Sequence, residues 1–518
     1  MEQNTMSRTE KFSRNVLFAV LAEIISSILS FVVRLIFIQN LKIEYLGIRG
    51  LFSNILTVLS LAELGAGSAI IYSMYKPLAE KDTEKIKSLI QLYKNIYRSV
   101  GLFILVLGML FFPFLDFFIR ERPSISSGEF NIIYALTVFQ TAVTYFFSYR
   151  YSIYTANQEG FVLTKYGIFF SAFKSAAQIA ALLLCKNYII YLCTGIAFSL
   201  LQNLVLSAKA NRDFPFLKEP AKPLDKDSRN KIRKNIAAMF LYRLGVTASM
   251  TIDTLLMSKF FGLVTVGLYS NYHLVIGYSD KIFSTILGKI VPSLGNLLVT
   301  SDKRKQMQVF TVLQMVYYWL TTYLAVGLII LLNPLIALLF GRDYLLPQAV
   351  VTMLAINIAL TNFQRPCSFI RDAAGLFWYG KFRPLATAIL NILCSLAAIH
   401  FWGLAGIMIG TALANVLTYV WYDPYIVFKH TLKGKLSGYY IRYLKHWGLL
   451  LVLTLVCRKL QQLVHTGSGA GDFLCGALIV TAVVNGIFFL LYSRSDSMAY
   501  LKNSVIQFMK NRGSGHGL

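Results

Sequence analysis

Charged and hydroxyl side chains share one helical face inside the first apolar stretch of the sequence. Within residues 15–38, Glu23, Ser27, Ser30 and Arg34 follow one another at i, i+4, i+7 and i+11. An ionised group at the middle of a bilayer costs roughly 2.5–3.5 kcal/mol on insertion scales, so it is kept where it meets water, a partner or a ligand. This face therefore indicates a charged interior rather than a surface in contact with lipid.

A second face of this kind lies in the stretch 236–260. Its members are Arg243, Thr247, Thr251, Thr254 and Ser258. Asp253 lies roughly a quarter-turn away from them, at about 3.6 residues per turn. Other apolar stretches add further ionisable or polar residues: Arg49, Glu63, Lys174, Asn271, Tyr278, Lys281, Lys289 and Arg365. Basic residues outnumber acidic ones in this set.

The surplus of basic groups suits an anionic ligand, because arginine and lysine pair strongly with phosphate oxygens. The candidate ligand-binding residues of such a cavity are Arg34, Arg243, Lys281, Arg49 and Arg365. The acidic residues Glu23, Glu63 and Asp253 are candidate charge partners or sites for a coupling ion, either a proton or sodium. Structural pairs that pin helices are the alternative for Glu23 with Arg34 and for Arg243 with Asp253. Lys174 and Lys289 lie near span ends, from which a long side chain reaches the membrane interface.

The elements that carry these residues are long apolar stretches. The chain has 518 residues, 56% of them hydrophobic, and its mean hydropathy is +0.58. A membrane-crossing helix needs about 20 mostly apolar residues. About fourteen stretches qualify: 15–38, 46–73, 98–119, 131–154, 163–185, 188–208, 236–260, 264–298, 309–333, 346–370, 384–402, 404–428, 446–463 and 472–493. The first is too long for the apolar core of a signal peptide. We predict an all-α, polytopic membrane protein with about fourteen transmembrane helices.

Basic residues are spread along the chain in alternate loops. The formal net charge is +26, which by itself would be compatible with nucleic-acid binding. Nearly every second loop is basic, and this is the pattern by which cytoplasmic loops orient a membrane protein. We expect both termini in the cytoplasm and anionic membrane lipids as partners, and no nucleic acid.

Cysteine and histidine residues are dispersed. The cysteines lie in or near spans without paired metal spacing: Cys185, Cys193, Cys367, Cys394, Cys457 and Cys475. Apolar packing is the usual role of such residues. The sequence predicts neither a metal site nor a cofactor.

The longest basic loop divides the chain into two parts that echo each other. It contains Pro215, Pro220 and Pro223. We therefore expect a six-helix bundle in 1–208, a cytoplasmic linker in 209–235 and a second six-helix bundle in 236–430. Two further helices with a cytoplasmic tail should follow in 431–518. The motif Gly50-Leu-Phe-Ser-Asn54 returns as Gly267-Leu-Tyr-Ser-Asn271, 217 residues later. Internal repeats are the usual construction of transporters, with the site at the repeat interface. We therefore expect two pseudo-symmetric bundles.

One cytoplasmic segment has an amphipathic pattern. Ile86, Leu89, Ile90, Tyr93 and Tyr97 recur at helical spacing, with lysines elsewhere around the helix. The pattern predicts a helix that lies on the membrane surface. A short solvated connector is the alternative.

Three blocks of the sequence resemble polysaccharide (Wzx-type) flippases of the MATE/MOP exporter superfamily. They are Thr251–Tyr272, Tyr45–Asn54 continuing to Leu61–Ala69, and Ile370–Pro384. The resemblance covers nearly the whole chain. It implies two pseudo-symmetric six-helix bundles, with two further helices in many members. It also implies movement of an undecaprenyl-diphosphate-linked oligosaccharide to the outer leaflet, beside glycosyltransferases and a polymerase of the same pathway. By position, the cationic lining of such flippases falls here on Arg34, Arg243 and the neighbourhood of Asp253.

Two other functions compete with this one. A cation-coupled exporter of small amphiphiles would depend more on acidic cavity residues, and the basic surplus argues against it. A membrane enzyme, such as a glycan polymerase or an acyltransferase, would need a large outer loop or a histidine inside the membrane. The outer loops are short, and His400 lies at the end of its span, so a non-enzymatic role is favoured.

Overall fold

The computed structural model describes an all-helical chain. It describes residues 8–60, 66–120, 123–157, 159–287, 291–376, 379–380, 382–464 and 467–503, and no strand occurs among them. Some helical residues, among them Glu23, Arg243 and Lys281, are described by their backbone alone, and Glu63 lies outside the described residues. The chain divides into two compact units, Met1–Ser270 and Asn271–Leu518.

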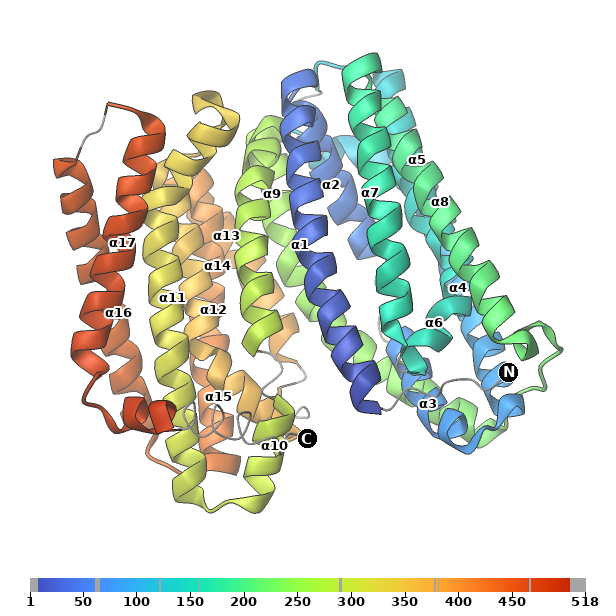
Figure 1. The fold of residues 1–518 in the computed structure, drawn as a ribbon. Helices are drawn as coiled ribbons and strands as arrows, with labels where there is room; N and C mark the ends of the chain where they lie inside the picture. Colours follow the sequence, from blue (N-terminus) through green and yellow to red (C-terminus); the bar gives the residue numbers. More distant parts are fainter. Residues whose placement is uncertain are drawn as a thin grey trace. The chain divides into compact units, whose positions relative to one another are not determined.

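The first unit is built from long helices and two short 3-10 turns. They are α1 (Arg8–Asn40), α2 (Glu44–Leu59), α3 (Ala66–Glu80), α4 (Thr83–Leu110), η2 (Phe112–Phe118), α5 (Ser127–Tyr145), α6 (Ser148–Ala156), α7 (Gly160–Cys185), α8 (Tyr188–Asp213), η3 (Pro215–Lys218) and the larger part of α9 (Lys226–Leu287). Within this unit α1 packs along α7, α7 along α8, and α4 along α5 (Figure 1). Their shared core includes Phe37, Phe52 and Tyr134, all nearly inaccessible to solvent.

The second unit continues with α10 (Val291–Thr300), α11 (Lys303–Phe340), η5 (Arg342–Tyr344), α12 (Gln348–Ala373), α13 (Arg383–Trp402), α14 (Leu404–Leu417), α15 (Tyr419–Val427), the π-helical turn η7 (Phe428–Leu432), α16 (Leu436–Leu463) and α17 (Gly469–Tyr492). Here α11 packs on α12, and α13 packs on α14 (Figure 1). The last two helices pack on each other and on α11. Trp319 of α11 donates its indole N–H to Asn485 of α17 at 2.8 Å, and Tyr492 and His446 join α17 to α16 at 2.7 Å.

The apolar helices turn many large side chains outward. Leu184 is 83% exposed, Phe401 79% and Leu490 77%, which is expected where lipid rather than water covers the surface. Helices satisfy every backbone group internally, so they suit a solvent without hydrogen bonds. Among the described residues, eight helices are long and apolar enough to cross a membrane, or ten when each bent pair counts as one span. The protein is thus a multi-pass, all-α membrane protein, and the count of fourteen stays a prediction.

A break in α9 separates the predicted seventh and eighth spans. Gly262 has φ +83° and ψ 172°, a backbone conformation that is accessible essentially to glycine alone. The helix is therefore interrupted between the predicted spans 236–260 and 264–298. The predicted division of the chain at 209–235, and the pseudo-symmetry of the two bundles, stay predictions.

The amphipathic face of α4 does not lie on the membrane, so that expectation is wrong. Ile86, Leu89, Ile90, Tyr93 and Tyr97 are buried in a cluster with side chains of α3, α5 and α6. Linker residues close the cluster from the other side: Phe214, Phe216, Leu217 and Leu224. The Lys87 ammonium pairs with Glu84 at 2.5 Å and with Glu219 at 2.9 Å, and the Ser88 hydroxyl donates to the Lys222 carbonyl at 2.6 Å. The pattern correctly identified a buried face, but protein covers it.

Candidate functional site

The predicted cation Arg34 is held by the second copy of the repeated motif. Its Nη2 donates to the Ser270 hydroxyl at 2.6 Å, and that hydroxyl donates in turn to the Gly267 carbonyl at 2.7 Å. A serine has one proton to donate and lone pairs to accept, so both bonds are compatible. Arg34 therefore connects α1 to α9 within the first unit.

Glycines allow α2 and α9 to approach each other closely beside this contact. A Cβ on Gly47 would lie 1.9 Å from the Leu263 carbonyl oxygen, and one on Gly267 would lie 2.7 Å from the Ile43 carbonyl oxygen. Real Cβ atoms do not approach backbone so closely. The start of α2 and the part of α9 around Leu263 and Gly267 thus lie in close contact where Gly47 and Gly267 have no side chain.

Arg49 opens into a cavity of about 340 Å³ in the first unit. The lining comes from α2 and its end, α5, α8 and α9: Arg49, Ser53, Leu56, Thr57, Ser60, Thr137, Gln140, Thr141, Tyr188, Leu192 and Thr247. This lining contains one cation and no carboxylate. The cavity is therefore suited to a neutral or anionic group.

The Arg49 guanidinium is positioned by aromatic residues at the start of α8. Its Nη1 donates to the Tyr191 hydroxyl at 3.2 Å, and this is its one hydrogen bond among the described residues. Tyr188 and Tyr191 stack with ring centroids 5.8 Å apart, and Phe37 meets the edges of both. Most donors of the planar guanidinium fork are left for a ligand.

Further cations of the first unit surround these tyrosines. The charges of Arg34 and Arg49 both act on Tyr188. Lys174 of α7, predicted to reach the membrane interface, is half-buried within electrostatic range of Arg49. The first unit thus places Arg34 and Arg49 within electrostatic range of Tyr188, and Lys174 within range of Arg49.

The polar face predicted for 236–260 is partly described. Thr247 lines the cavity, while Thr251, Thr254 and Ser258 are buried. Asp253 is half-buried and acts electrostatically on Tyr269. The side chains of Glu23, Arg243 and Lys281, and all of Glu63, lie outside the described residues, so their roles stay predictions.

Several cavity residues were missed by the sequence analysis. Thr137, Gln140 and Thr141 stand at i, i+3 and i+4 of α5, which is one helical face. The signal was present in the apolar stretch 131–154. None of these three residues is ionisable, so a search for intramembrane charges does not find them.

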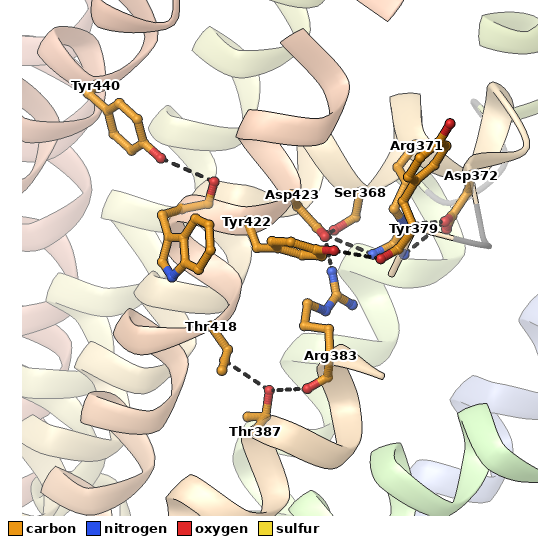
Figure 2. A network of polar contacts seen from close by, with 11 residues as sticks. Ser368, Arg371, Asp372, Tyr379, Arg383, Thr387, Thr418, Tyr422, Asp423 and Tyr440 are labelled. Carbon is orange, nitrogen blue, oxygen red and sulfur yellow. Dashed lines mark hydrogen bonds and ion pairs between the residues drawn. The ribbon is translucent and has the colours of Figure 1, made fainter. Parts of the chain in front are cut away.

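The second unit contains Arg365 and, separately, a buried ion cluster (Figure 2). Arg365 is half-buried on α12 within electrostatic range of Tyr317. In the cluster, Asp423 of α15 is fully buried and accepts hydrogen bonds from Ser368 at 3.1 Å, from Arg371 at 2.8 Å and from Arg383. Arg371 also binds the half-exposed Asp372 at 2.8 Å.

The cluster is electrically balanced and closed. The Arg371 and Arg383 side chains are only 6% and 4% exposed, and the Arg383 guanidinium also lies 3.9 Å from the centroid of the Tyr419 ring. Two arginines face two aspartates, and they tie the ends of α12, α13 and α15 together. Among the described residues, no group of three histidine, cysteine or acidic side chains is placed to bind a metal ion.

Comparison with known proteins identifies the fold. No protein-family model and no curated protein sequence matches the chain. A solved structure described as the lipid II flippase MurJ, in an inward closed conformation, superposes with a TM-score of 0.68 at 16% identity, over 92% of this chain and 99% of that one. The chain has the fold of MOP superfamily transporters.

Two MATE transporters share this fold. An inward-facing MATE family transporter of the MOP superfamily gives a TM-score of 0.60 at 14% identity, over 81% of this chain and 99% of that one. The MATE transporter VcmN of Vibrio cholerae gives 0.57 at 14% identity, over 84% and 100%. Identities this low establish the fold and leave the transported molecule open.

Proposed function

We propose that the protein is a flippase that moves an undecaprenyl-diphosphate-linked oligosaccharide from the cytoplasmic to the outer leaflet by alternating access, as a Wzx-type polysaccharide flippase. The observation that carries this proposal is the cavity beside Arg49, which contains a cation and no carboxylate. The fold similarity to a lipid II flippase supports it.

The obstacle to flipping is the charged diphosphate. A phosphate cannot enter hydrocarbon uncompensated, because the desolvation of its charge is too unfavourable. Arg49 offers a planar fork that matches phosphate oxygens, and Arg34 and Lys174 add positive potential nearby. The polyprenyl chain is itself apolar and stays in the lipid. Arg243, Lys281 and Arg365 are proposed as further ligand-binding residues.

The acidic residues are proposed to neutralise the basic residues of the site after the substrate has been released. Glu23, Glu63 or Asp253 can pair with a basic residue once the substrate leaves, or bind a coupling proton or sodium ion. A site with several moderate contacts suits transport, since the substrate must also be released.

The alternative is a cation-coupled exporter of small amphiphiles, which the fold similarity to MATE transporters favours. A cationic drug would be repelled by Arg49, and the cavity lining offers no carboxylate to bind it. We therefore rank this function second. A glycan polymerase or an acyltransferase ranks last, because the structures with this fold are transporters.

The proposed setting is the cell membrane with both termini in the cytoplasm, as the loop charges predict. Glycosyltransferases and a polymerase of the same pathway would supply and consume the substrate.

The test is reconstituted flipping. Purified protein in liposomes is given undecaprenyl-diphosphate-linked saccharide, and accessibility of the sugar to an external lectin is followed with time. Arg49→Ala should slow flipping about tenfold to a hundredfold, since a hydrogen bond to a charged group contributes roughly 1.5–3 kcal/mol. Arg49→Lys should restore only part of the rate, because lysine cannot bind bidentately.

Arg494→Ala, at an exposed arginine outside the cavity, is the control. A wild-type rate for Arg49→Ala would show that the anionic group binds elsewhere. Efflux of a cationic dye without flipping would favour the exporter.

A further inference from the structure

Four hydroxyl groups on the wall of the cavity formed by α2, its C-terminal end and α5 direct their protons into their own helices. Thr57 donates to the Ser53 carbonyl at 2.7 Å and Ser60 donates to the Leu56 carbonyl at 2.8 Å. On α5, Thr137 donates to the Ile133 carbonyl at 2.7 Å and Thr141 donates to the Thr137 carbonyl at 2.9 Å. Each hydroxyl has a single proton, so what remains is its lone pairs.

In this arrangement the four hydroxyls offer lone pairs to a ligand. Arg49 offers charged donors that match phosphate oxygens, whereas this wall suits a neutral group with several O–H or N–H donors. Gln140, which lines the cavity between Thr137 and Thr141, adds an amide that can donate as well as accept.

The cavity has room for a sugar ring with its substituents. Its volume of about 340 Å³ lies within the range of about 300–1,000 Å³ that is usual for small-molecule sites.

We propose that the wall formed by Thr57, Ser60, Thr137, Gln140 and Thr141 is a saccharide subsite that binds the sugar directly attached to the diphosphate, with Arg49 binding the phosphate. The proposal rests on the proposed function, and it makes this wall the part of the cavity that selects the first sugar of the glycan.

The test compares lipids with and without that sugar. Purified full-length protein in nanodiscs is titrated with undecaprenyl diphosphate and with undecaprenyl-diphosphate-linked monosaccharides carrying N-acetylglucosamine, glucose or galactose. Kd values are measured by native mass spectrometry. Wild type should bind at least one sugar-bearing lipid about tenfold more tightly than the bare lipid. The double variant Thr57→Val/Thr141→Val should lose most of that difference, at about two- to tenfold for each hydrogen bond, with its affinity for the bare lipid unchanged.

Controls separate the subsite from folding and from the anion site. Thr57→Ser/Thr141→Ser retains both acceptors and should bind as wild type does. Thr144→Val makes the same change on α5 at a threonine outside the cavity lining, and should also leave binding unchanged. Arg49→Ala should weaken both classes of lipid.

The outcomes are distinguishable. If wild type binds the bare lipid but none of the sugar-bearing lipids more tightly, the saccharide subsite is wrong and the proposed function stands. The same holds if the valine variant weakens both classes equally. If wild type binds neither class of lipid, the proposed function is wrong, and the subsite with it.

Discussion

Arginines stand in two contrasting environments in this protein. In the first unit, Arg49 is exposed to a cavity, makes one hydrogen bond among the described residues, and meets no carboxylate in the cavity lining. In the second unit, Arg371 and Arg383 are almost fully buried around Asp423. Charge inside a membrane protein is expensive in either case, but only the second region compensates it within the chain. The first region leaves the compensation to water or to a ligand.

The difference separates two roles of a charged side chain. A closed, balanced cluster holds helices together and gives little to a ligand, because its charges are buried and already paired. An open cation contributes little to folding and remains available. Substitutions in both regions test this contrast through the free energy of unfolding.

Asp423→Ala should destabilise the protein most, by about 3–5 kcal/mol, because it leaves two buried arginines without their shared carboxylate. The apparent Tm of purified protein and its abundance in membranes measure this. Asp372→Ala removes a half-exposed partner of Arg371 and should have a much smaller effect. Equal effects of the two changes would contradict a closed cluster.

Gly47→Ala should destabilise the first unit by about 1–3 kcal/mol, as expected for overpacking. The new methyl group would overlap the Leu263 carbonyl, and backbone cannot move aside as a flexible side chain can. Gly128→Ala places a methyl group in open space and is the matched control. The Tm of each purified variant, measured by thermal unfolding, gives the difference in stability. A wild-type Tm for Gly47→Ala would mean that the two helices are farther apart.

The bond between Arg34 and Ser270 should contribute about 1 kcal/mol, since it is charge-assisted but only partly buried. A double-mutant cycle of Arg34→Ala and Ser270→Ala measures this coupling in chemical unfolding. If the effects of the two single changes add, the bond contributes nothing to stability. Arg34 would then be an available cation like Arg49 and not a structural one like Arg383.

Arg49→Leu should change the free energy of unfolding least, by about 0.5 kcal/mol or less, as for a side chain outside any structural network. Denaturation of the purified variant without lipid measures it. If the free energy of unfolding fell by several kcal/mol, Arg49 would have a structural role like that of Arg371 and Arg383, and the two regions would not differ.

The sequence predicted the helical membrane fold because apolar length alone decides it. It also singled out Arg34, which the structure places against Ser270 of the repeated motif, and Arg49, which lines the cavity; their roles in binding stay predictions. Asp423 was missed, since one acidic residue within Tyr419–Val427 barely alters an apolar pattern. Its partner arginines come from α12 and α13, and their meeting is a matter of tertiary packing.

The cavity could not be predicted as a unit for the same reason. Its lining comes from four helices far apart in sequence, and no local pattern links Thr57 to Gln140. The error at α4 is of another kind. Helical periodicity shows which side chains are covered, and it does not distinguish lipid from a neighbouring segment of protein.

The segment that covers α4 bears on how the chain responds to proteases. Its basic and proline-rich composition suggests a loosely tethered hinge that trypsin would cut first. Instead Phe214, Phe216, Leu217 and Leu224 are packed into a cluster, and Glu219 is bound to Lys87. Cleavage requires a segment to unfold locally into the enzyme, and here such unfolding would break apolar packing. The connection thus belongs to the first folded module, and native membranes treated with trypsin should retain it intact.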